Sequence, residues 1–369
     1  MIKCMKISKE QGLLKFKLFE KGIYLDEQVR SRLFEAGYRV PSVVRTGASY
    51  GIEAILESGL CVNIPINEKS PYRLSTDFRD VTDEKGISVS KIKILKNPIS
   101  IDLNLDEKVI PSAAKICFDR LGITVYSGCA FKEGKKGCRF CGIDKASHYS
   151  SHYLMKPNEV LQILDSAMEI PNNGIRHILL SGGVIPKEDF GAAIFAEIAS
   201  VIKQKYPKFS IYVMLPPPPK NSSLKSMINA GVDEIALNIE IFNQELAKKL
   251  IPGKNEIGIE RYFNALEFLG SQMAKFGARC LLMGGIEPIA STLKGIEAIS
   301  QRGVMPIISH YRAVHNALPS CLDKADTMYS FWESASEVAD KYNMVVGPTC
   351  IPCQNNVIAL PIGDVFRYY

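Results

Sequence analysis

The sequence lacks any hydrophobic run long enough to cross a membrane. A membrane-spanning helix needs about 20 consecutive apolar residues, and no stretch of this 369-residue chain approaches that length. No secretory signal opens the chain, and disulfides are uncommon in proteins that stay in the cytosol. We therefore expect a cytoplasmic protein without membrane partners, in which oxidised pairs among the ten cysteines would be unusual.

The sequence also lacks a basic tract. The net charge of +6 is spread along the chain, whereas a nucleic-acid-binding arm would gather lysines and arginines among aromatic residues. Nucleic acid is therefore unsupported as a partner, and an acidic or phosphorylated partner is equally compatible. The hydrophobic share of 46% and the charged share of 23% are ordinary for a soluble globular enzyme. The length allows one large domain with an appendage, or two domains.

Three cysteines in one glycine-rich loop are the main feature that is present. Cys129, Cys138 and Cys141 are separated by eight and two residues and follow the apolar run 121–126. Thiolates are the usual ligands of iron–sulfur clusters, and four would close a cubane. Three thiolates leave one iron of the cluster without a protein ligand, so a small molecule can bind there. A catalytic zinc ion keeps an open coordination position in the same way. A structural zinc site that borrows His148 or His152, and disulfides, are the alternatives.

From about residue 113 onward, predicted strands alternate with helices of ten or more residues. This alternation is typical of βαβ units and a parallel sheet. The predicted strands are 121–126, 178–180, 211–215, 234–237, 279–283 and 305–309. The first predicted helix begins at Pro157. The other five cover residues 194–202, 223–230, 260–275, 293–300 and 328–342. Six repeats fall short of the eight that close a TIM barrel, so the sequence predicts an α/β fold with a partial (β/α)6 barrel over residues 113–345.

Residues 1–112 are predicted to form a small accessory α+β domain or lid. They contain short alternating runs, at 15–18 and 87–94 for example, and one predicted helix over 25–36 with Asp26 as its N-cap. The glycine-containing stretch 45–51 is either a ligand-holding turn or, more simply, a connection. Residues 346–369 are predicted to form a C-terminal segment.

The residues that follow the predicted strands should meet at one rim. In parallel barrels the chemistry lies at the carboxyl edge, where strands end and loops begin. Beside Cys129, this rule selects 181–183, Asn238 and Glu240, 284–287, and 310–312.

With these residues placed, residues 115 to about 360 resemble the radical S-adenosylmethionine (SAM) enzymes. In that superfamily three cysteines after the first strand hold a [4Fe-4S] cluster, and the amine and carboxylate of SAM chelate the open iron. The commonest spacing is three and two residues, whereas this chain has eight and two. Phe140 before the third cysteine and the strand-then-loop context both match the superfamily.

The resemblance extends to a biotin-synthase-related group with the same eight-and-two spacing, and to the general build of archaeal-type lipoyl synthases. The segments that carry it are 238–242, 252–254, 260–262, 284–288 and 347–356. The resemblance implies that Gly182 and Gly183 approach the methionine amine, that Asn238 or Glu240 meets the ribose, that Arg261 pairs with the carboxylate, and that Gly284 to Ile286 lie along the adenine. Val184 stands where an acidic residue often follows the glycine pair. Simple turns at the glycines and a surface ion pair at Arg261 are the alternatives.

A second group of cysteines, Cys321, Cys350 and Cys353, lies near the C-terminus. Two residues between the last two thiols suit a single metal or a cluster. The three are predicted to bind an auxiliary cluster, such as a second [4Fe-4S] cluster, near the substrate. A redox dithiol, a zinc site and no role are the alternatives. His310 and His315 are interpreted as ordinary core or loop residues, and Cys4, Cys61, Cys117 and Cys280 as small buried ones.

The resemblance implies an enzyme in which the reduced cluster cleaves SAM and the resulting 5′-deoxyadenosyl radical takes hydrogen from an unactivated carbon. It implies a small-molecule or carrier-protein-bound substrate and an electron donor such as ferredoxin or flavodoxin. The similarity to biotin and lipoyl synthases makes sulfur insertion the predicted reaction. Radical rearrangement or carbon–carbon chemistry, and a non-catalytic iron–sulfur or zinc protein, are the alternatives.

Overall fold

The computed structural model describes residues 6–38, 51–96, 99–105, 108–143, 152–312 and 320–368. Their strands form two sheets, one of five strands in the order β2-β1-β5-β4-β3 and one of eight in the order β13-β12-β11-β10-β9-β8-β7-β6. Among these residues, none of the helices combines the length and the apolar character that crossing a membrane requires. His148, His315, Cys4 and residues 45–50, which the sequence analysis singled out, lie outside the described residues.

The larger sheet contains six strands that pair in parallel and follow the order of the chain. They are β8 (Arg120–Tyr126), β9 (His177–Gly182), β10 (Ser210–Met214), β11 (Glu234–Ala236), β12 (Ala278–Gly284) and β13 (Met305–His310). These strands confirm the predicted partial barrel. An antiparallel hairpin of β6 (Ile99–Leu105) and β7 (Lys108–Cys117) extends the sheet beside β8, and the sequence analysis did not anticipate it.

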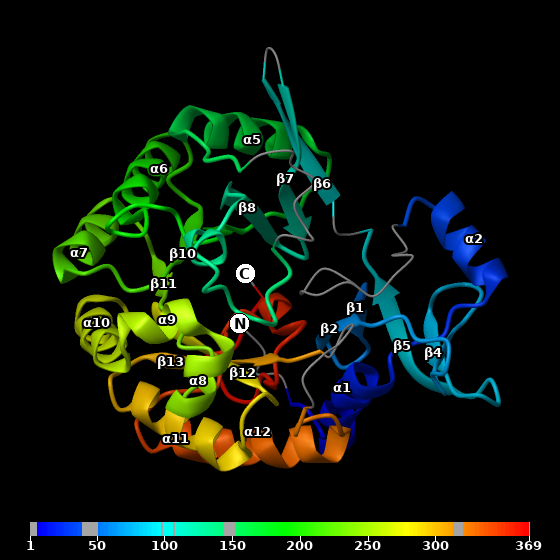
Figure 1. The fold of residues 1–369 in the computed structure, drawn as a ribbon. Helices are drawn as coiled ribbons and strands as arrows, with labels where there is room; N and C mark the ends of the chain where they lie inside the picture. Colours follow the sequence, from blue (N-terminus) through cyan, green and yellow to red (C-terminus); the bar gives the residue numbers. More distant parts are fainter. Residues whose placement is uncertain are drawn as a thin grey trace.

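Helices surround the outside of the curved parallel strands (Figure 1). They are α5 (Pro157–Glu169), α6 (Ala192–Lys205), α7 (Asn221–Asn229), α10 (Ile259–Gln272), α11 (Ile289–Ser300) and α12 (Ala325–Asp340). All six correspond to predicted helices, with ends that differ by a few residues. Three shorter helices, α3 (Ala130–Glu133), α8 (Gln244–Leu250) and α9 (Pro252–Ile257), were not predicted.

Side chains alternate between the two faces of each parallel strand, as the pleat requires. On the helix-facing side, Ile123, Leu180 and Val213 are completely buried. On the other side, Arg120 and His177 are the first residues of β8 and β9. The interior of the barrel is therefore polar at the amino ends of the strands, whereas large aliphatic residues fill the space beneath the helices.

The N-terminal region contains two helices beside the five-stranded sheet. They are α1 (Lys9–Lys21) and α2 (Glu27–Glu35), and the strands are β1 (Ile52–Leu56), β2 (Cys61–Ile64), β3 (Arg73–Leu74), β4 (Asp80–Thr82) and β5 (Ser88–Ile94). Helix α2 confirms the predicted helix, and the side chain of Asp26 caps it. The interpretation of 15–18 as an extended run was wrong, since these residues lie inside α1. A capping box between Ser8 and Gln11 starts that helix.

The domain boundary expected between residues 112 and 113 falls inside β7, which pairs with both β6 and β8. The division of the chain at that point stays a prediction. The C-terminal segment runs back along the barrel, where Gly347 pairs with Ile307 and Val357 pairs with Ser309. It also joins the two sheets, because the amide of Asn63 donates to the carbonyl of Asn355 over 2.7 Å.

Lys15 on α1 also binds the C-terminal segment through hydrogen bonds. Its ammonium is completely buried and donates to the carbonyl oxygens of Gln354 (2.8 Å) and Ala359 (2.7 Å). Burial lowers the pKa of Lys15 to about 7. The helix therefore contributes two hydrogen bonds that hold the turn containing Cys350 and Cys353.

Candidate functional site

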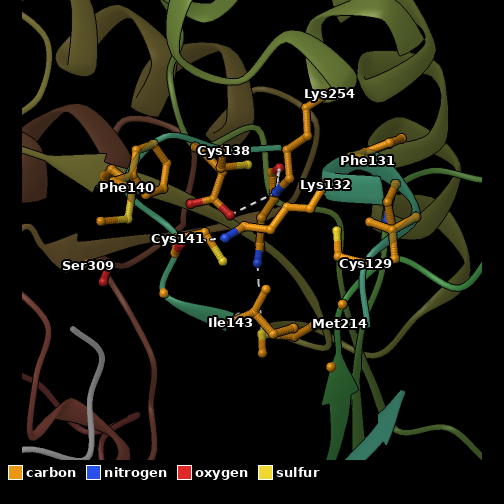
Figure 2. Close-up of a pocket in the computed structure, with 18 of the residues that line it drawn as sticks. Cys129, Phe131, Lys132, Cys138, Phe140, Cys141, Ile143, Met214, Lys254 and Ser309 are labelled. Carbon is orange, nitrogen blue, oxygen red and sulfur yellow. Dashed lines mark hydrogen bonds and ion pairs between the residues drawn. The ribbon is translucent and has the colours of Figure 1, made fainter. Parts of the chain in front are cut away.

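The three cysteines of the glycine-rich loop line one cavity of about 490 Å³ at the carboxyl ends of the parallel strands (Figure 2). Cys129 follows β8 and precedes α3. Cys138 and Cys141 lie further along the loop and face the same cavity. Phe140, Gly182, Gly183, Asn238 and Glu240 also line it. The strand-end rule thus brings eight of the predicted site residues to one place.

Backbone hydrogen bonds tie the cysteine loop to its neighbours at both ends. The amide of Ala130 donates to the carbonyl of Val184 (2.8 Å), and the amide of Arg139 donates to the carbonyl of Leu250 at the end of α8 (2.9 Å). The ammonium of Lys132 donates to the carbonyl of Cys141 (2.8 Å). The two short helices after β11 therefore support the loop, although they were not predicted.

The glycine pair after β9 lets the loop approach the sheet. A methyl group added to Gly183 would lie 2.7 Å from the Cβ atom of Cys129 and would overlap the carbonyl oxygen of Gly128. Gly182 has a φ of +146°, which side-chain-bearing residues rarely adopt. Glycine is therefore required at both positions for Cys129 to reach the cavity.

A largely buried ion pair lies beside Cys138. The ammonium of Lys254 donates to the Oε1 atom of Glu240 (2.8 Å) and to the carbonyl of Asn238 (2.9 Å), and both charged side chains are 14% exposed. Burial disfavours the charged form of Lys254, but the Glu240 carboxylate outweighs it, so the pKa of Lys254 is raised. Glu240 has a φ of +67°.

Lys254 belongs to a segment that the resemblance singled out, but the sequence analysis gave it no role. The signal was the lysine in the Pro-Gly-Lys stretch 252–254. Burial raises the pKa of the nearby Cys138 thiol to about 12, and the Lys254 ammonium acts against that rise. The lysine therefore places a positive charge where a thiolate would have to form.

Aromatic residues and a partly buried histidine complete the cavity. The rings of Phe140 and Tyr311 meet edge to face with centroids 6.5 Å apart. His310 at the end of β13 stacks on Phe19 of α1 with centroids 5.2 Å apart. Burial, aided by the Arg312 charge, lowers the pKa of His310 to about 3. His310 is therefore neutral at pH 7, and α1 supports this wall of the cavity.

Three predicted cofactor residues lie outside the lining of this cavity. Arg261 donates to the carbonyl of Pro218 and to the Oδ1 atom of Asn221, both over 2.7 Å. Gly284 packs against Ile308. Ile286 packs against the buried cluster of Ile241, Ala247 and Ile251, as Phe140 and Cys138 also do. Contacts of these three residues with SAM stay predictions.

A smaller cavity of about 320 Å³ adjoins the first and shares Ile143, Gly182 and Met214 with it. It continues along the inner face of β8 past Thr124 and Gly122 and reaches Arg120. The space beside the three cysteines therefore extends into the barrel toward the amino ends of the strands.

The structure does not bring Cys321 to the other two C-terminal cysteines. Cys321 is exposed, and its thiol donates to the carbonyl of Glu287 over 3.1 Å at the carboxyl edge. Cys350 and Cys353 instead lie with Asp119 and His177 at the amino ends of β8 and β9. The three-cysteine ligand set predicted for an auxiliary cluster therefore does not assemble. Sequence reasoning missed Asp119 and His177, whose contact with the cysteines depends on the return of the C-terminal segment.

His152, proposed as an alternative zinc ligand, has another partner. Its Nδ1 atom lies 3.0 Å from the Oε1 atom of Glu133, its ring packs edge-on against Tyr126, and it does not line the cavity. The three thiols thus line the cavity without this histidine. This donor set suits a cluster that keeps one position for a small molecule.

The fold and the three-thiol cavity define a partial α/β barrel with an iron–sulfur type of ligand set at its carboxyl edge. The sequence pattern of the Radical SAM superfamily matches residues 123–303, which include all three cysteines. The match covers just under half of the chain, so residues 123–303 are similar to a radical SAM domain. In that superfamily three such cysteines imply a [4Fe-4S] cluster and SAM, and the three thiols of this cavity suit the ligand set of the cluster.

Two solved structures are similar to part of the chain. The first is methylornithine synthase (PylB), with 16% identity and a TM-score of 0.44 over 62% of this chain and 71% of that one. The second is HydG, a maturase of the [FeFe]-hydrogenase, with 12% identity and a TM-score of 0.47 over 62% of this chain. The match spans 52% of HydG. No protein of curated function matches the sequence.

Proposed function

We propose that this protein is a radical SAM enzyme that holds a [4Fe-4S] cluster through Cys129, Cys138 and Cys141. The observation that carries the proposal is the convergence of these thiols on one cavity inside the region that is similar to a radical SAM domain. When bound, the cluster and SAM supply a one-electron cleavage that yields methionine and a 5′-deoxyadenosyl radical. The radical takes a hydrogen atom from an unactivated carbon of the substrate.

The protein's own residues position SAM and exclude water. Gly182 and Gly183 bring backbone close to the cysteine loop, where the resemblance places the methionine amine. The Glu240 carboxylate is held by Lys254 at the cavity wall, where it can accept a hydrogen bond from a ribose hydroxyl. Aromatic side chains such as Phe140 cover part of the cavity wall and exclude water there, which limits side reactions of a radical with water.

The substrate is proposed to occupy the adjoining 320 Å³ cavity inside the barrel. This cavity meets the first one at Gly182 and Met214, so a ligand there would lie next to the radical source. Its volume suits a small molecule or the end of an acyl chain on a carrier protein. Thr124 and Ser181 provide hydroxyl groups along it.

An acidic electron donor of the ferredoxin or flavodoxin type is the proposed redox partner. The loop that carries the cysteines exposes Lys135, Lys136 and Arg139, and α8 exposes Lys248 and Lys249 nearby. The carbonyl of Lys249 accepts from Arg139 over 2.9 Å, which places these cations on one surface. A positive surface favours encounter with a negatively charged partner.

Two candidates exist for the reaction after hydrogen abstraction. Sulfur insertion at an unactivated C–H bond requires a sulfur source, for which the sequence offered an auxiliary cluster at the C-terminal cysteines. Radical rearrangement or carbon–carbon chemistry needs none. The separation of Cys321 from Cys350 and Cys353 favours the second candidate, because the three-cysteine set predicted for a second cluster does not assemble.

The test is anaerobic reconstitution followed by reduction with dithionite in the presence of SAM. The wild type should bind about four irons at this site, as expected for one cubane, and should release 5′-deoxyadenosine and methionine. A combined Cys129→Ala, Cys138→Ala and Cys141→Ala variant should release neither. Cys321→Ala is the matched control, because this exposed thiol lies outside the cavity, and it should retain both products. Cleavage by the triple variant, or none by the reconstituted wild type, would refute the proposal.

A further inference from the structure

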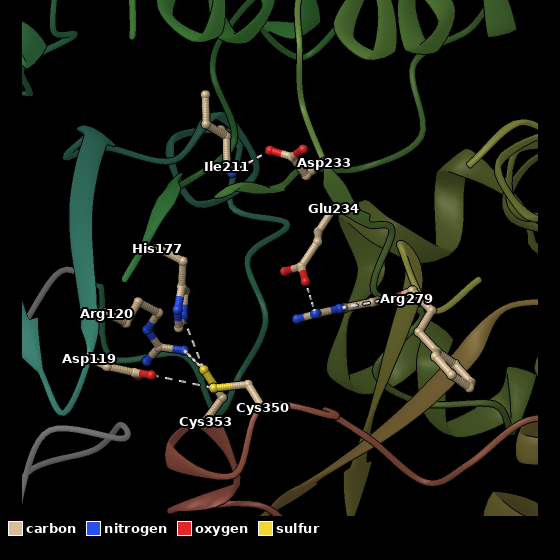
Figure 3. Close-up of polar contacts among 10 residues, drawn as sticks. Asp119, Arg120, His177, Ile211, Asp233, Glu234, Arg279, Cys350 and Cys353 are labelled. Carbon is tan, nitrogen blue, oxygen red and sulfur yellow. Dashed lines mark hydrogen bonds and ion pairs between the residues drawn. The ribbon is translucent and has the colours of Figure 1, made fainter. Parts of the chain in front are cut away.

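Four potential metal ligands gather at the end of the barrel opposite the three-thiol cavity (Figure 3). They are Asp119, His177, Cys350 and Cys353, and their ligand atoms all lie within 4.8 Å of one another. The Nε2 atom of His177 lies 3.2 Å from the Sγ atom of Cys353. The Sγ atom of Cys350 lies 3.9 Å from the Oδ2 atom of Asp119. The cluster thus joins segments that are 231 residues apart.

Hydrogen bonds that involve no ligand atom hold these segments in place. The carbonyl of Asp119 accepts from the amides of Arg176 (2.8 Å) and His177 (3.4 Å), which fixes the turn before β8 against the start of β9. Cys353 lies inside the short 3-10 helix Pro352–Gln354, and Cys350 comes just before that helix. Lys15 fastens that helix through the carbonyl of Gln354. The four ligands are therefore brought together before any metal binds.

The arrangement leaves a polar atom that requires a partner. The Oδ1 atom of Asp119 is buried and has no hydrogen-bond partner among the described residues. Burying a carboxylate oxygen without a partner is costly, and native structures rarely leave such an atom unpaired. A cation between the carboxylate and the thiols would satisfy it.

The charges of the cluster also balance around a divalent ion. Two thiolates and one carboxylate carry three negative charges, and His177 contributes none when neutral. Arg120 is partly buried beside the cluster, with its Nη1 atom 4.0 Å from the Sγ atom of Cys353, and supplies one positive charge. A divalent cation brings the sum to zero, which reduces the cost of burying the group.

The spacing of the ligand atoms favours one ion over a cluster. Zinc binds sulfur at about 2.3 Å and nitrogen or oxygen at about 2.0–2.2 Å, so tetrahedral ligands lie roughly 3.3–3.8 Å apart. Two of the separations, 3.2 and 3.9 Å, lie close to that range, and no two of the four ligand atoms are more than 4.8 Å apart. A cubane would place each thiolate on a different iron and so hold the sulfur atoms further apart.

We propose that Asp119, His177, Cys350 and Cys353 bind one zinc ion in a closed, tetrahedral structural site. The ion would fasten the C-terminal segment to the amino ends of β8 and β9 and so close this end of the barrel. The four protein ligands leave no open position for a substrate. This proposal is independent of the reaction proposed for the other end of the barrel.

The first experiment measures metals on the full chain with the three-thiol site removed. The Cys129→Ala, Cys138→Ala and Cys141→Ala variant should retain about one zinc per chain and no acid-labile sulfide, as expected for a single-ion site. After exchange with cobalt(II), it should show the visible absorption of a tetrahedral ion and a sulfur-to-cobalt charge-transfer band. Iron with sulfide in place of zinc would overturn the proposal, as would a Cys350–Cys353 disulfide without metal.

The second experiment tests the ligands one at a time. Cys353→Ser and His177→Ala should lower the zinc content at least tenfold, whereas Cys321→Ser should leave it unchanged. Asp119→Asn retains the size of the side chain and guards against a variant that simply fails to fold. It should bind zinc at least tenfold more weakly in competition with a chelator, and unchanged affinity would overturn the role of Asp119. SAM cleavage by the wild type is scored separately, so either proposal can fail alone.

Discussion

Replacement of Gly183 by alanine should release the cluster from a protein that is otherwise folded. The added methyl group would lie 2.7 Å from the Cβ atom of Cys129, whereas carbon atoms pack at about 3.5–4.0 Å. The loop must therefore retreat by about 1 Å. Rotating a side chain cannot relieve the overlap, since the carbonyl oxygen of Gly128 is also in the way.

Overpacking of this kind usually costs about 1–3 kcal/mol and occasionally more. Because the conflict is with backbone, we expect the upper end, about 3 kcal/mol, in the free energy of unfolding measured with urea. We also expect less than one of the four irons of a cubane to be retained after reconstitution. Gly122→Ala is the matched control on β8, because its methyl group would meet nothing closer than 3.8 Å. Wild-type iron content and stability in Gly183→Ala would refute this account of the glycine.

Two further predictions concern charge. Lys254→Met leaves Glu240 largely buried without its cation, which should cost about 3 kcal/mol of unfolding free energy and weaken SAM binding measured by calorimetry. The control Lys136→Met removes an exposed pair with Glu256 and should cost less than about 1 kcal/mol; equal losses would contradict the prediction. The pKa of His310 falls from 6.5 to about 3 on folding, so its contribution to stability is complete above pH 6.5 and is lost as the pH falls toward 3. Between pH 7 and pH 5 the free energy of unfolding, measured with urea, should fall by about 2 kcal/mol more in the wild type than in His310→Phe. Equal falls in the two proteins would show that His310 does not titrate in this way.

The local sequence pattern was sufficient to predict the parallel strands and most of the residues at their carboxyl edge. The six parallel strands are short apolar runs between amphipathic helices, and this alternation depends on neighbouring residues alone. Because every parallel strand ends at the same edge, the positions of Cys129, Gly183 and Glu240 at one cavity followed from their place after a strand. No knowledge of the packing was needed for that step.

Helix α1 shows where local pattern was insufficient. Lys15 and Lys17 alternate with Phe16 and Leu18, which suggested an extended run. Lys15 is instead completely buried. Its burial is possible because two carbonyl groups of the C-terminal segment accept hydrogen bonds from its ammonium. A charged residue in the core can be recognised only when the distant partners that compensate it are known.

The sequence by itself determined the three-thiol loop, the parallel strands and the edge at which they end, since spacing, alternation and chain order are properties of neighbouring residues. Only the tertiary structure decided that Lys254 neutralises Glu240 and that Cys321 stands apart from Cys350 and Cys353. It also decided that Asp119 and His177 join those two cysteines. These contacts link segments far apart in the chain, and their closeness depends on how the C-terminal segment returns along the barrel.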